Sequence, residues 1–496
     1  MLDMDNKMYV AHSHSPIYID PKMVNRHGLI AGATGTGKTV SLQVLAETFS
    51  RAGIPSFLAD MKGDLAGLSQ AGVVNKFIEA RIQEFGMDRS ALNFSGAPVR
   101  FFDVFGEQGH PMRTTISEMG PLLLSRLLDL NDTQEGVLNI VFRIADEKQL
   151  LLIDIKDLRA MLDWTSKNSK EYTSVYGNVS ASSIGAIQRA LLALESQGAD
   201  KFFGEPAFNI FDLLQSEGGR GVLNILAADK LMMAPKLYST FLLWLLSELY
   251  DQLPEVGDLP VPKFVFFFDE AHMLFEDAPK ALKERVELVV RLIRSKGVGV
   301  YFISQSPADI PIEILGQLGN RIQHALRAFT PQDQKVVRAA AQTFRTNPKF
   351  NTEQAILELG TGEALVSFLD DKGSPSVVER AKMLFPLSQI GAIRGEQREA
   401  LIKQSRLFGM YERQFDRDSA YERISIEQME EQRMAAARER REMEYQREKK
   451  VAPSGTQRRA GSKSALDKAI GSAATSIGRS VGTQIVRGIL GAIFKR

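Results

Sequence analysis

Residues 32–39 read Gly32-Ala-Thr34-Gly35-Thr36-Gly37-Lys38-Thr39 and directly follow the short apolar run Gly28-Leu-Ile-Ala31. The stretch fits the pattern G-x-x-x-x-G-K-[ST] without a mismatch. Glycines let such a loop wrap a polyphosphate with its backbone N–H groups turned inward, where side chains would collide. Lys38 would supply positive charge to the β- and γ-phosphates, and Thr39 a hydroxyl to Mg²⁺. We therefore expect a nucleotide to be bound by Gly32, Thr34, Gly35, Thr36, Gly37, Lys38 and Thr39.

The residues after the loop favour this interpretation. Residues 40–52 place Val40, Leu42, Leu45 and Phe49 at helical spacing. The positive N-terminal end of that helix would point at the phosphates. A glycine-rich turn without a ligand is the alternative, and the agreement of strand, loop and helix argues against it.

A second motif supplies two carboxylates. The apolar run Phe264-Val-Phe-Phe-Phe268 ends in Asp269 and Glu270. A buried strand would deliver both to the carboxyl edge of a sheet, where α/β proteins bind their ligands. Asp269 suits the holding of Mg²⁺, and Glu270 is placed to orient and deprotonate a water that attacks the γ-phosphate. Acidic pairs at strand ends are common, so the pair alone does not indicate a nucleotide site. Together with the phosphate loop upstream, it does.

Further polar residues end or precede expected strands. Gln305 ends the run Val298–Ser304 and could hydrogen-bond the water or the γ-phosphate, unless it is merely a polar strand end. Arg291 and Arg294 end the expected helix 284–295. Arginine there could stabilise a transferring phosphoryl group, although a helix C-terminus also favours a cation; for Arg291 we prefer that second explanation.

Two weaker candidates remain. The charges of Asp60-Met-Lys62-Gly-Asp64 could contact a neighbouring subunit or the margin of the nucleotide site, or simply satisfy one another in a turn. Arg327, at the end of the last core strand, could reach a neighbour's nucleotide.

Apolar runs alternate with helical patterns, which is typical of a mostly parallel sheet covered on both faces. We expect an α/β, RecA-like P-loop core in two parts, 1–113 and 206–400. Residues 114–205 contain four amphipathic patterns and no strand-like run, so we expect a helical insertion. It could serve as a lid or substrate-facing appendage, or be a purely structural elaboration.

The remaining chain differs in composition. Residues 401–450 form a charged, expectedly helical segment, 451–464 a flexible Gly, Ser and Arg linker, and 465–496 an amphipathic C-terminal helix. Small residues in the last segment favour association with another helix, and its cations leave attachment to a membrane surface as the alternative.

Global composition narrows the classes of protein. With 61 basic and 60 acidic residues, the net charge of +1 gives no overall attraction to nucleic acid, so any polyanion must meet a local basic surface. The absence of cysteine excludes disulfides and thiolate metal sites. No signal-peptide pattern or long apolar stretch stands out, and we expect a cytoplasmic protein without a membrane span.

The loop 32–39, the Asp269-Glu270 pair, Gln305 and the lead-in Arg294-Ser-Lys-Gly297 together resemble the HerA/FtsK branch of P-loop motor ATPases. The chain is most similar to an uncharacterised bacterial family of HerA-like helicase-domain proteins, over most of residues 15–390. The resemblance implies ATP and Mg²⁺ as cofactors, and a homo-oligomeric, commonly hexameric ring with ATP between subunits that moves DNA or a polypeptide. It also implies that Glu270 is catalytic, Gln305 the sensor and Arg294 the arginine before the sensor strand.

Two departures limit what the resemblance implies. HerA helicases carry an N-terminal barrel that binds a nuclease, whereas about thirty residues precede the loop here, so the resemblance does not extend to a nuclease partner. The helical insertion and the C-terminal helix also lie outside the motor pattern. We thus favour an ATP-hydrolysing motor acting on DNA, with an ATP-dependent oligomeric scaffold that does not act on nucleic acid as the alternative. A small-molecule phosphotransferase is disfavoured, because a glutamate beside Asp269 fits the activation of water.

Overall fold

The computed structural model describes residues 1–3, 5–276 and 280–451. The chain divides into two units, Met1–Glu427 and Gln428–Arg496, of which the first holds the strands of the described residues. The expected linker and C-terminal helix lie outside the described residues, apart from the start of the linker at Val451.

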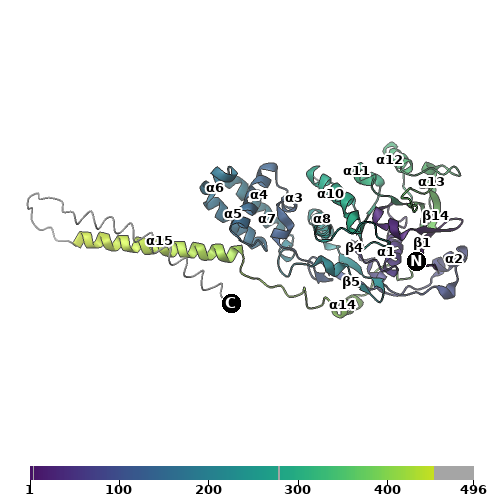
Figure 1. Cartoon of the computed structure of the whole chain (residues 1–496), viewed down its shortest axis with the longest axis horizontal. Coiled ribbons are helices and arrows are strands. Elements are labelled where there is room, and N and C mark those ends of the chain that lie inside the picture. The colour runs from purple at the N-terminus through teal and green to yellow at the C-terminus, as the bar shows by residue number, and fades with distance from the viewer. Residues whose placement is uncertain (4, 277–279, 452–496) are drawn as a thin grey trace, which may run out of the picture. The chain divides into compact units, whose positions relative to one another are not determined.

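The first unit is built around one large sheet (Figure 1). Its strands follow one another in space as β2 (Pro16–Ile19), β1 (Met8–His12), β14 (Glu379–Met383), β13 (Glu363–Ser367), β12 (Asn320–Gln323), β3 (Gly28–Ala31), β11 (Val298–Ser304), β10 (Phe264–Phe268), β4 (Ser56–Asp60), β9 (Leu223–Ala227), β5 (Val99–Asp103) and β6 (His110–Pro111). The eight strands from β12 to β6 run parallel, and the others pair antiparallel. The expected mostly parallel α/β sheet is confirmed.

The central strands are apolar on both faces. Every residue of β10 and β11 is buried, as parallel strands covered by helices require. Successive side chains point to opposite faces, so Phe264, Phe266 and Phe268 enter one apolar core, and Val265 and Phe267 the other. The sheet therefore separates two cores and carries its polar chemistry at its edges.

Each face has its own helices (Figure 1). The core on one face includes residues of α1 (Lys38–Arg51) and α2 (Lys76–Glu84), with α14 (Gly395–Gln404) packed beside them. The core on the other face includes α8 (Pro235–Gln252) and α10 (Lys280–Ile293). Short helices α11 (Ile312–Leu315), α12 (Pro331–Gln342) and α13 (Thr352–Glu358) follow β11 and β12.

An antiparallel extension was not anticipated. Strands β13, β14, β1 and β2 continue the sheet beyond β12. β1 pairs with β14 although about 370 residues of sequence separate Ala11 from its partner Met383. Such pairing depends on tertiary context, since these short segments carry little local strand signal. A small hairpin of β7 (Ser216–Glu217) and β8 (Arg220–Gly221) forms separately.

Residues 114–205 contain α3 (Ile116–Leu127), α4 (Asp132–Glu147), α5 (Ile155–Lys167), α6 (Ser169–Tyr176) and α7 (Ala181–Glu195). Capping boxes begin α3 at Thr115 and Glu118, α4 at Asn131 and Gln134, and α5 at Asp154 and Asp157. The insertion shares the apolar core of α8, so it packs on the sheet domain.

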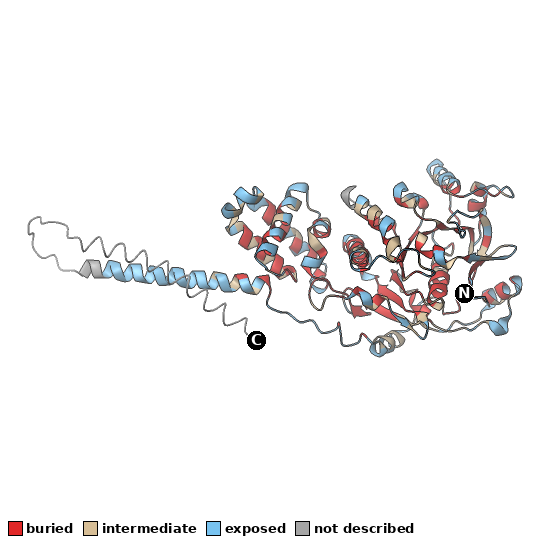
Figure 2. Cartoon of the chain, viewed as in Figure 1, coloured by how far each residue is buried: buried red, intermediate tan, exposed pale blue. Residues whose placement is uncertain are grey.

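Within 401–450, α14 ends at Gln404 and α15 (Ala420–Val451) begins sixteen positions later. The segment between them is anchored on the first unit, because Arg113 donates to the Tyr411 carbonyl over 2.7 Å. Ser419 and Tyr421 then bond the buried Asp157 of α5, which fixes the start of α15 on the insertion. Figure 2 shows α15 exposed over most of its length, from Met429 to Arg447.

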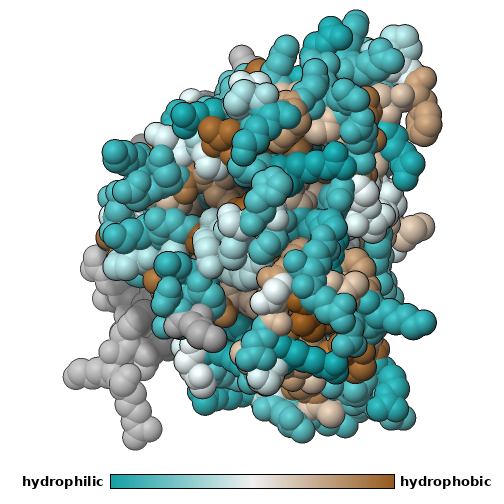
Figure 3. Space-filling model, turned by 90° about the vertical axis from the view of Figure 1, so that its right-hand side faces the viewer, coloured by the Kyte–Doolittle hydropathy of each residue, from teal (hydrophilic) through white to brown (hydrophobic). Residues whose placement is uncertain are grey.

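The face seen in Figure 3 is mostly hydrophilic, with small and separate hydrophobic patches. Among the helices that the structure describes, none is long and apolar enough to cross a lipid bilayer.

Candidate nucleotide site

The phosphate loop lies at the centre of the sheet. β3, which leads into it, pairs in parallel with β11 on one side and β12 on the other. Gly35 and Gly37 have φ of 79° and 115°, and Gly32 has φ of 155°, a region that side chains rarely adopt. α1 begins at Lys38 with no side chain capping its first turn. The free N–H groups of that turn therefore face the loop, as an anion site requires.

His324 braces the loop from behind. A side chain at Gly32 would place its Cβ 2.5 Å from the Cβ of His324, so only glycine fits there. The buried imidazole bonds Ser41 Oγ through Nε2 over 2.8 Å and the Glu363 carbonyl through Nδ1 over 2.9 Å. Burial lowers the pKa of His324 to about 4, so the ring is neutral. Its sequence context carries no motif, which is why it was not anticipated.

The loop residues divide into a tip and a base. Thr34 and Gly35 form the exposed tip, whereas Thr36 is buried and bonds the Ala33 carbonyl over 2.7 Å. Thr39 is partly buried in the first turn of α1.

Lys38 lies across the loop and close to the acidic pair. Its Nζ donates to the Gly32 carbonyl over 2.6 Å and to the Ala33 carbonyl over 3.3 Å. Burial lowers the pKa of Lys38, while the charges of Glu270 and Asp269 oppose that shift. The two motifs thus share one electrostatic environment.

Asp269 follows β10 directly and accepts a hydrogen bond from the Glu270 N–H over 3.0 Å. Its carboxyl is surrounded by protein, and desolvation followed by the charge of Glu270 raises its pKa to about 7. Tyr238 of α8 donates to the Asp269 carbonyl over 2.8 Å and so holds the strand end. Tyr238 lies in no recognisable motif, so its contact with Asp269 could not be predicted from the sequence.

Glu270 has a left-handed backbone with φ of 47°, which is uncommon for a residue other than glycine. Its side chain is 19% exposed, and Oε2 lies 3.5 Å from His272 Nδ1. Buried Oε2 accepts no hydrogen bond among the described residues. His272 follows the acidic pair by two positions, and that proximity is the signal that could have identified it.

These carboxylates fit a divalent cation and a water molecule. Asp269 resists ionisation without a counter-charge, and Glu270 Oε2 needs a donor. Oxygen ligands from Asp269 and the Thr39 hydroxyl are those that Mg²⁺ prefers in proteins.

We expect Asp269→Asn to stabilise the protein above neutral pH when neither nucleotide nor Mg²⁺ is present. A folded-state pKa of about 7 lies above the unfolded value of about 3.9, so the resulting stability is present at low pH and is lost as pH rises through 7. Melting temperatures measured from pH 5 to 8 should therefore fall more steeply for the wild type than for the variant. The exposed Asp258→Asn is the control. Parallel curves for Asp269→Asn and the wild type would contradict the prediction.

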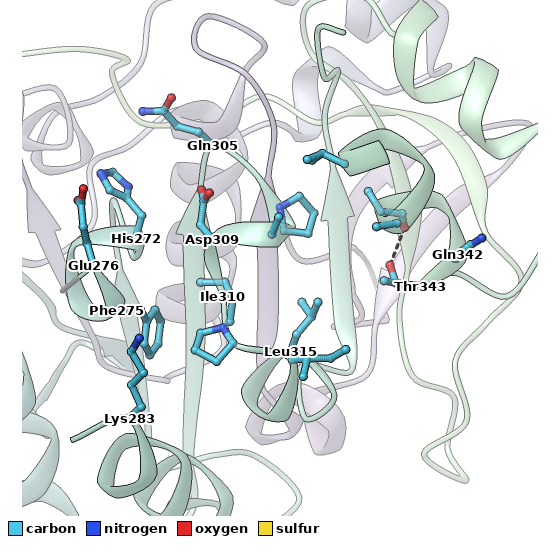
Figure 4. Close-up of a pocket in the computed structure, with 17 residues that line it drawn as sticks. His272, Phe275, Glu276, Lys283, Gln305, Asp309, Ile310, Leu315, Gln342 and Thr343 are labelled. Atoms are coloured by element: carbon cyan, nitrogen blue, oxygen red, sulfur yellow. Dashed lines mark hydrogen bonds between the residues drawn. The ribbon is translucent and has the colours of Figure 1, made fainter. Parts of the chain in front are cut away.

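Gln305 follows β11 at the same edge of the sheet and is exposed. With His272 and Glu276 of the short helix α9 (His272–Phe275) and its exit, it lines a cavity of about 1030 Å³ (Figure 4). Asp309 accepts from Ser304 Oγ over 2.5 Å and fixes the turn after the strand. This placement suits an amide that reports on events at the acidic pair.

Arg294 lies elsewhere. It precedes β11, whose carboxyl end at Ser304 pairs with Ala31 beside the loop. Seven strand residues separate the two edges by roughly 20 Å. Arg294 bonds Asp258 Oδ1 over 3.0 Å at that far edge. The structure thus places Arg294 at the edge of the sheet opposite its own phosphate loop, because parallel strands carry their starts and ends to opposite edges.

Arg291 and Arg327 lie in different parts of the structure. Nη1 of Arg291 lies 3.9 Å from Oε1 of Glu287 in the same helix. Arg327 is exposed two residues beyond Ala325, whose carbonyl accepts from the Ala33 N–H over 2.8 Å. It is thus on the loop's edge of the sheet.

The Asp60–Asp64 segment is a turn at the margin of the site, and the Asp60 carboxylate accepts hydrogen bonds from the backbone of the same turn. Asp60 accepts from the N–H groups of Asp64 over 3.1 Å and Leu65 over 3.2 Å. Burial and the Asp64 charge raise the pKa of Asp60 to about 6. The charges of Lys62 and Asp64 also act on Asp269.

A family model and a known protein match this chain. The family model described as "Helicase HerA-like C-terminal" matches residues 5–496. A protein of Methanocaldococcus jannaschii described as "Probable helicase" is 30% identical over 125 residues, which are 24% of this chain and 22% of that protein.

A solved structure supports this fold, and a second is reported beside it. The bacterial conjugative coupling protein TrwB, unbound, matches with a TM-score of 0.50 and 17% identity, over 76% of this chain and 89% of that one. VirB4 of Thermoanaerobacter pseudethanolicus has a TM-score of 0.46 and 14% identity, over 77% and 97%. The loop, the acidic pair and the match along residues 5–496 lead to one conclusion: the chain belongs to the HerA-like helicase C-terminal family of P-loop ATPases.

Proposed function

We propose that this chain is an ATP-hydrolysing motor of the HerA/FtsK type that works as an oligomeric ring on DNA. The observation that carries the proposal is the meeting of Lys38, Asp269 and Glu270 at one edge of the sheet. Membership of the HerA-like family supports ATP as the nucleotide and DNA as the cargo.

Each residue has a role in this mechanism. N–H groups of the loop and the first turn of α1 bind the phosphates, and Lys38 neutralises the β- and γ-oxygens. Thr39 and Asp269 would hold Mg²⁺, which when bound offsets the charge that develops on the phosphates. Glu270 orients a water and accepts its proton, and its Oε2 accepts no hydrogen bond among the described residues that would compete. Gln305 senses the γ-phosphate from the adjacent strand end.

Duplex DNA should stimulate ATP turnover, and the stimulation should fall steeply as salt rises. A near-neutral chain must bind phosphates through local cations, whose counterion release is salt-dependent. Turnover is measured with and without duplex DNA at several salt concentrations, with Glu270→Gln as the background. Turnover that is indifferent to DNA would reject a DNA motor.

That outcome would favour the alternative, an ATP-dependent scaffold. The exposed stretch of α15 from Met429 to Arg447 favours it, because a long solvated helix is suited to recruit partners. Its signature is an assembly whose mass changes with ATP while turnover ignores nucleic acid.

Arg294 is proposed to act on the nucleotide of a neighbouring subunit. Arg294→Ala should then slow hydrolysis more than it weakens ATP binding. Because Arg294 and Glu270 would come from different subunits at each site, mixing Arg294→Ala with Glu270→Gln subunits should give turnover well above either variant alone. Arg291→Ala is the matched control and should behave as wild type. Normal turnover by Arg294→Ala, or a mixture no better than its parts, would return Arg294 to a structural pair with Asp258.

A further inference from the structure

A second cavity lies between the helical insertion and the sheet domain. Its volume is about 750 Å³, within the range of small-molecule sites. Its walls come from α3, from the start of α8 and from α9 and its exit. Apolar side chains make up much of the lining, namely Leu122, Leu130, Met233 and Met273. The nucleotide mechanism uses none of these residues.

Arg126 of α3 lines this cavity and forms no ion pair among the described residues. Its Nη2 donates to Ser239 Oγ over 3.0 Å and, more weakly, to the Leu274 carbonyl over 3.4 Å. Its Nη1 is buried and has no hydrogen-bond partner among the described residues. Burial lowers the pKa of Arg126 to about 10. A guanidinium that is largely removed from water, with no counter-charge among the described residues, is costly, and an anion in the cavity would supply that charge.

The start of α8 adds donors to the same wall. Pro235 occupies the first turn and Ala234 precedes it, so no side chain caps this helix of 18 residues. Lys236 and Ser239 line the cavity with them. At the mouth, Lys236 pairs with Asp129 over 2.8 Å, and both are well exposed. Arg126 and the N–H groups of the first turn of α8 therefore lie inside, and the solvated Lys236–Asp129 pair lies at the rim.

We propose that this cavity binds a small organic anion, with a carboxylate or phosphate group on Arg126 and an apolar body against Leu122, Leu130 and Met233. Guanidinium donors recognise either oxyanion, so the two headgroups are separate arms of the test. The carboxylates of Glu135 and Glu276 also line the cavity and favour a ligand with a single anionic group over a polyanion.

The occupied cavity would act on the catalytic pair, and this step rests on the proposed function. Arg126 reaches the Leu274 carbonyl on α9, four residues after Glu270. Arg126 also donates to Ser239, which is adjacent in the chain to Tyr238. The Tyr238 hydroxyl in turn donates to the Asp269 carbonyl. A ligand that redirects Arg126 therefore changes the support of both acids and changes the rate of turnover.

The test uses the full chain and anilinonaphthalene sulfonate, a fluorescent probe with an apolar body and one anionic group. Hexyl phosphate and hexanoate compete with it, and 1-hexanol is the neutral match. We expect at least one anion to displace the probe at a concentration about tenfold lower than hexanol, and Arg126→Met to abolish that preference. Arg189→Met, an exposed arginine of the same insertion, should keep it.

A second variant tests the site in case Arg126→Met fails to fold. Met233 is 89% exposed at the mouth, so Met233→Glu leaves the fold intact and should weaken anion binding by repulsion. Equal displacement by hexanol and both anions, or Arg126→Met and Arg189→Met behaving alike, would overturn the site. Binding that leaves ATP turnover unchanged would overturn the coupling alone. Binding in a chain that never hydrolyses ATP would support the site and reject the proposed function.

Discussion

Glu270→Gln should reduce ATP turnover by about 10²- to 10⁴-fold, the usual cost of removing a general base, while ATP binding persists. The Glu270 side chain is 19% exposed, and its Oε2 accepts no hydrogen bond among the described residues, so no protein donor competes with a water for the carboxylate. An amide of the same shape keeps the packing and the left-handed backbone but cannot accept the proton. Turnover and nucleotide affinity are measured separately on the same preparation.

Glu396→Gln is the control for this change. Glu396 is an exposed glutamate in the first turn of α14 and lines neither cavity, so its variant should keep wild-type turnover. If Glu270→Gln lost binding and turnover together, the residue would be structural and the assigned chemistry would fail.

Lys38→Ala should weaken ATP binding by about tenfold to hundredfold, because the ammonium group forms charge-assisted hydrogen bonds to the phosphates. In the structure its Nζ already lies across the loop on the carbonyls of Gly32 and Ala33. Calorimetric titration with ATP measures the loss directly.

Lys62→Ala separates a specific contact from general electrostatics. Lys62 is exposed and its charge acts on both Lys38 and Asp269, so its removal changes the local field without removing a loop ligand. We expect a much smaller loss than for Lys38→Ala. Unchanged affinity in Lys38→Ala would remove Lys38 from the phosphate site.

The parts of the site that sequence predicted are those with local causes. The phosphate loop needs glycines at fixed positions for its backbone, and β10 needs an unbroken apolar run to be buried on both faces. Both requirements depend only on residues that are consecutive in the sequence. Residues 114–205 also show helical spacing of apolar residues. The exception is α6, which has no buried residues and was not expected as a helix.

Residues that act through tertiary contacts left no such trace. His324 and Tyr238 bond groups far away in the chain, and neither stands in a motif. Arg126 occupies the last turn of α3, where a cation is ordinary, and only tertiary packing brings it to Ser239 of α8 and the Leu274 carbonyl of α9.

Sequence by itself determined that this chain folds around a parallel sheet with a phosphate loop and an acidic pair at one edge. It did so because strand burial and loop geometry depend on neighbouring residues. Only the tertiary structure decided which distant groups meet. It pairs β1 with β14, puts Arg294 roughly 20 Å from the phosphate loop at the opposite edge of the sheet, and leaves Arg126 Nη1 buried with no hydrogen-bond partner among the described residues. These outcomes depend on strand direction and on the packing of segments far apart in the chain, which no local pattern encodes.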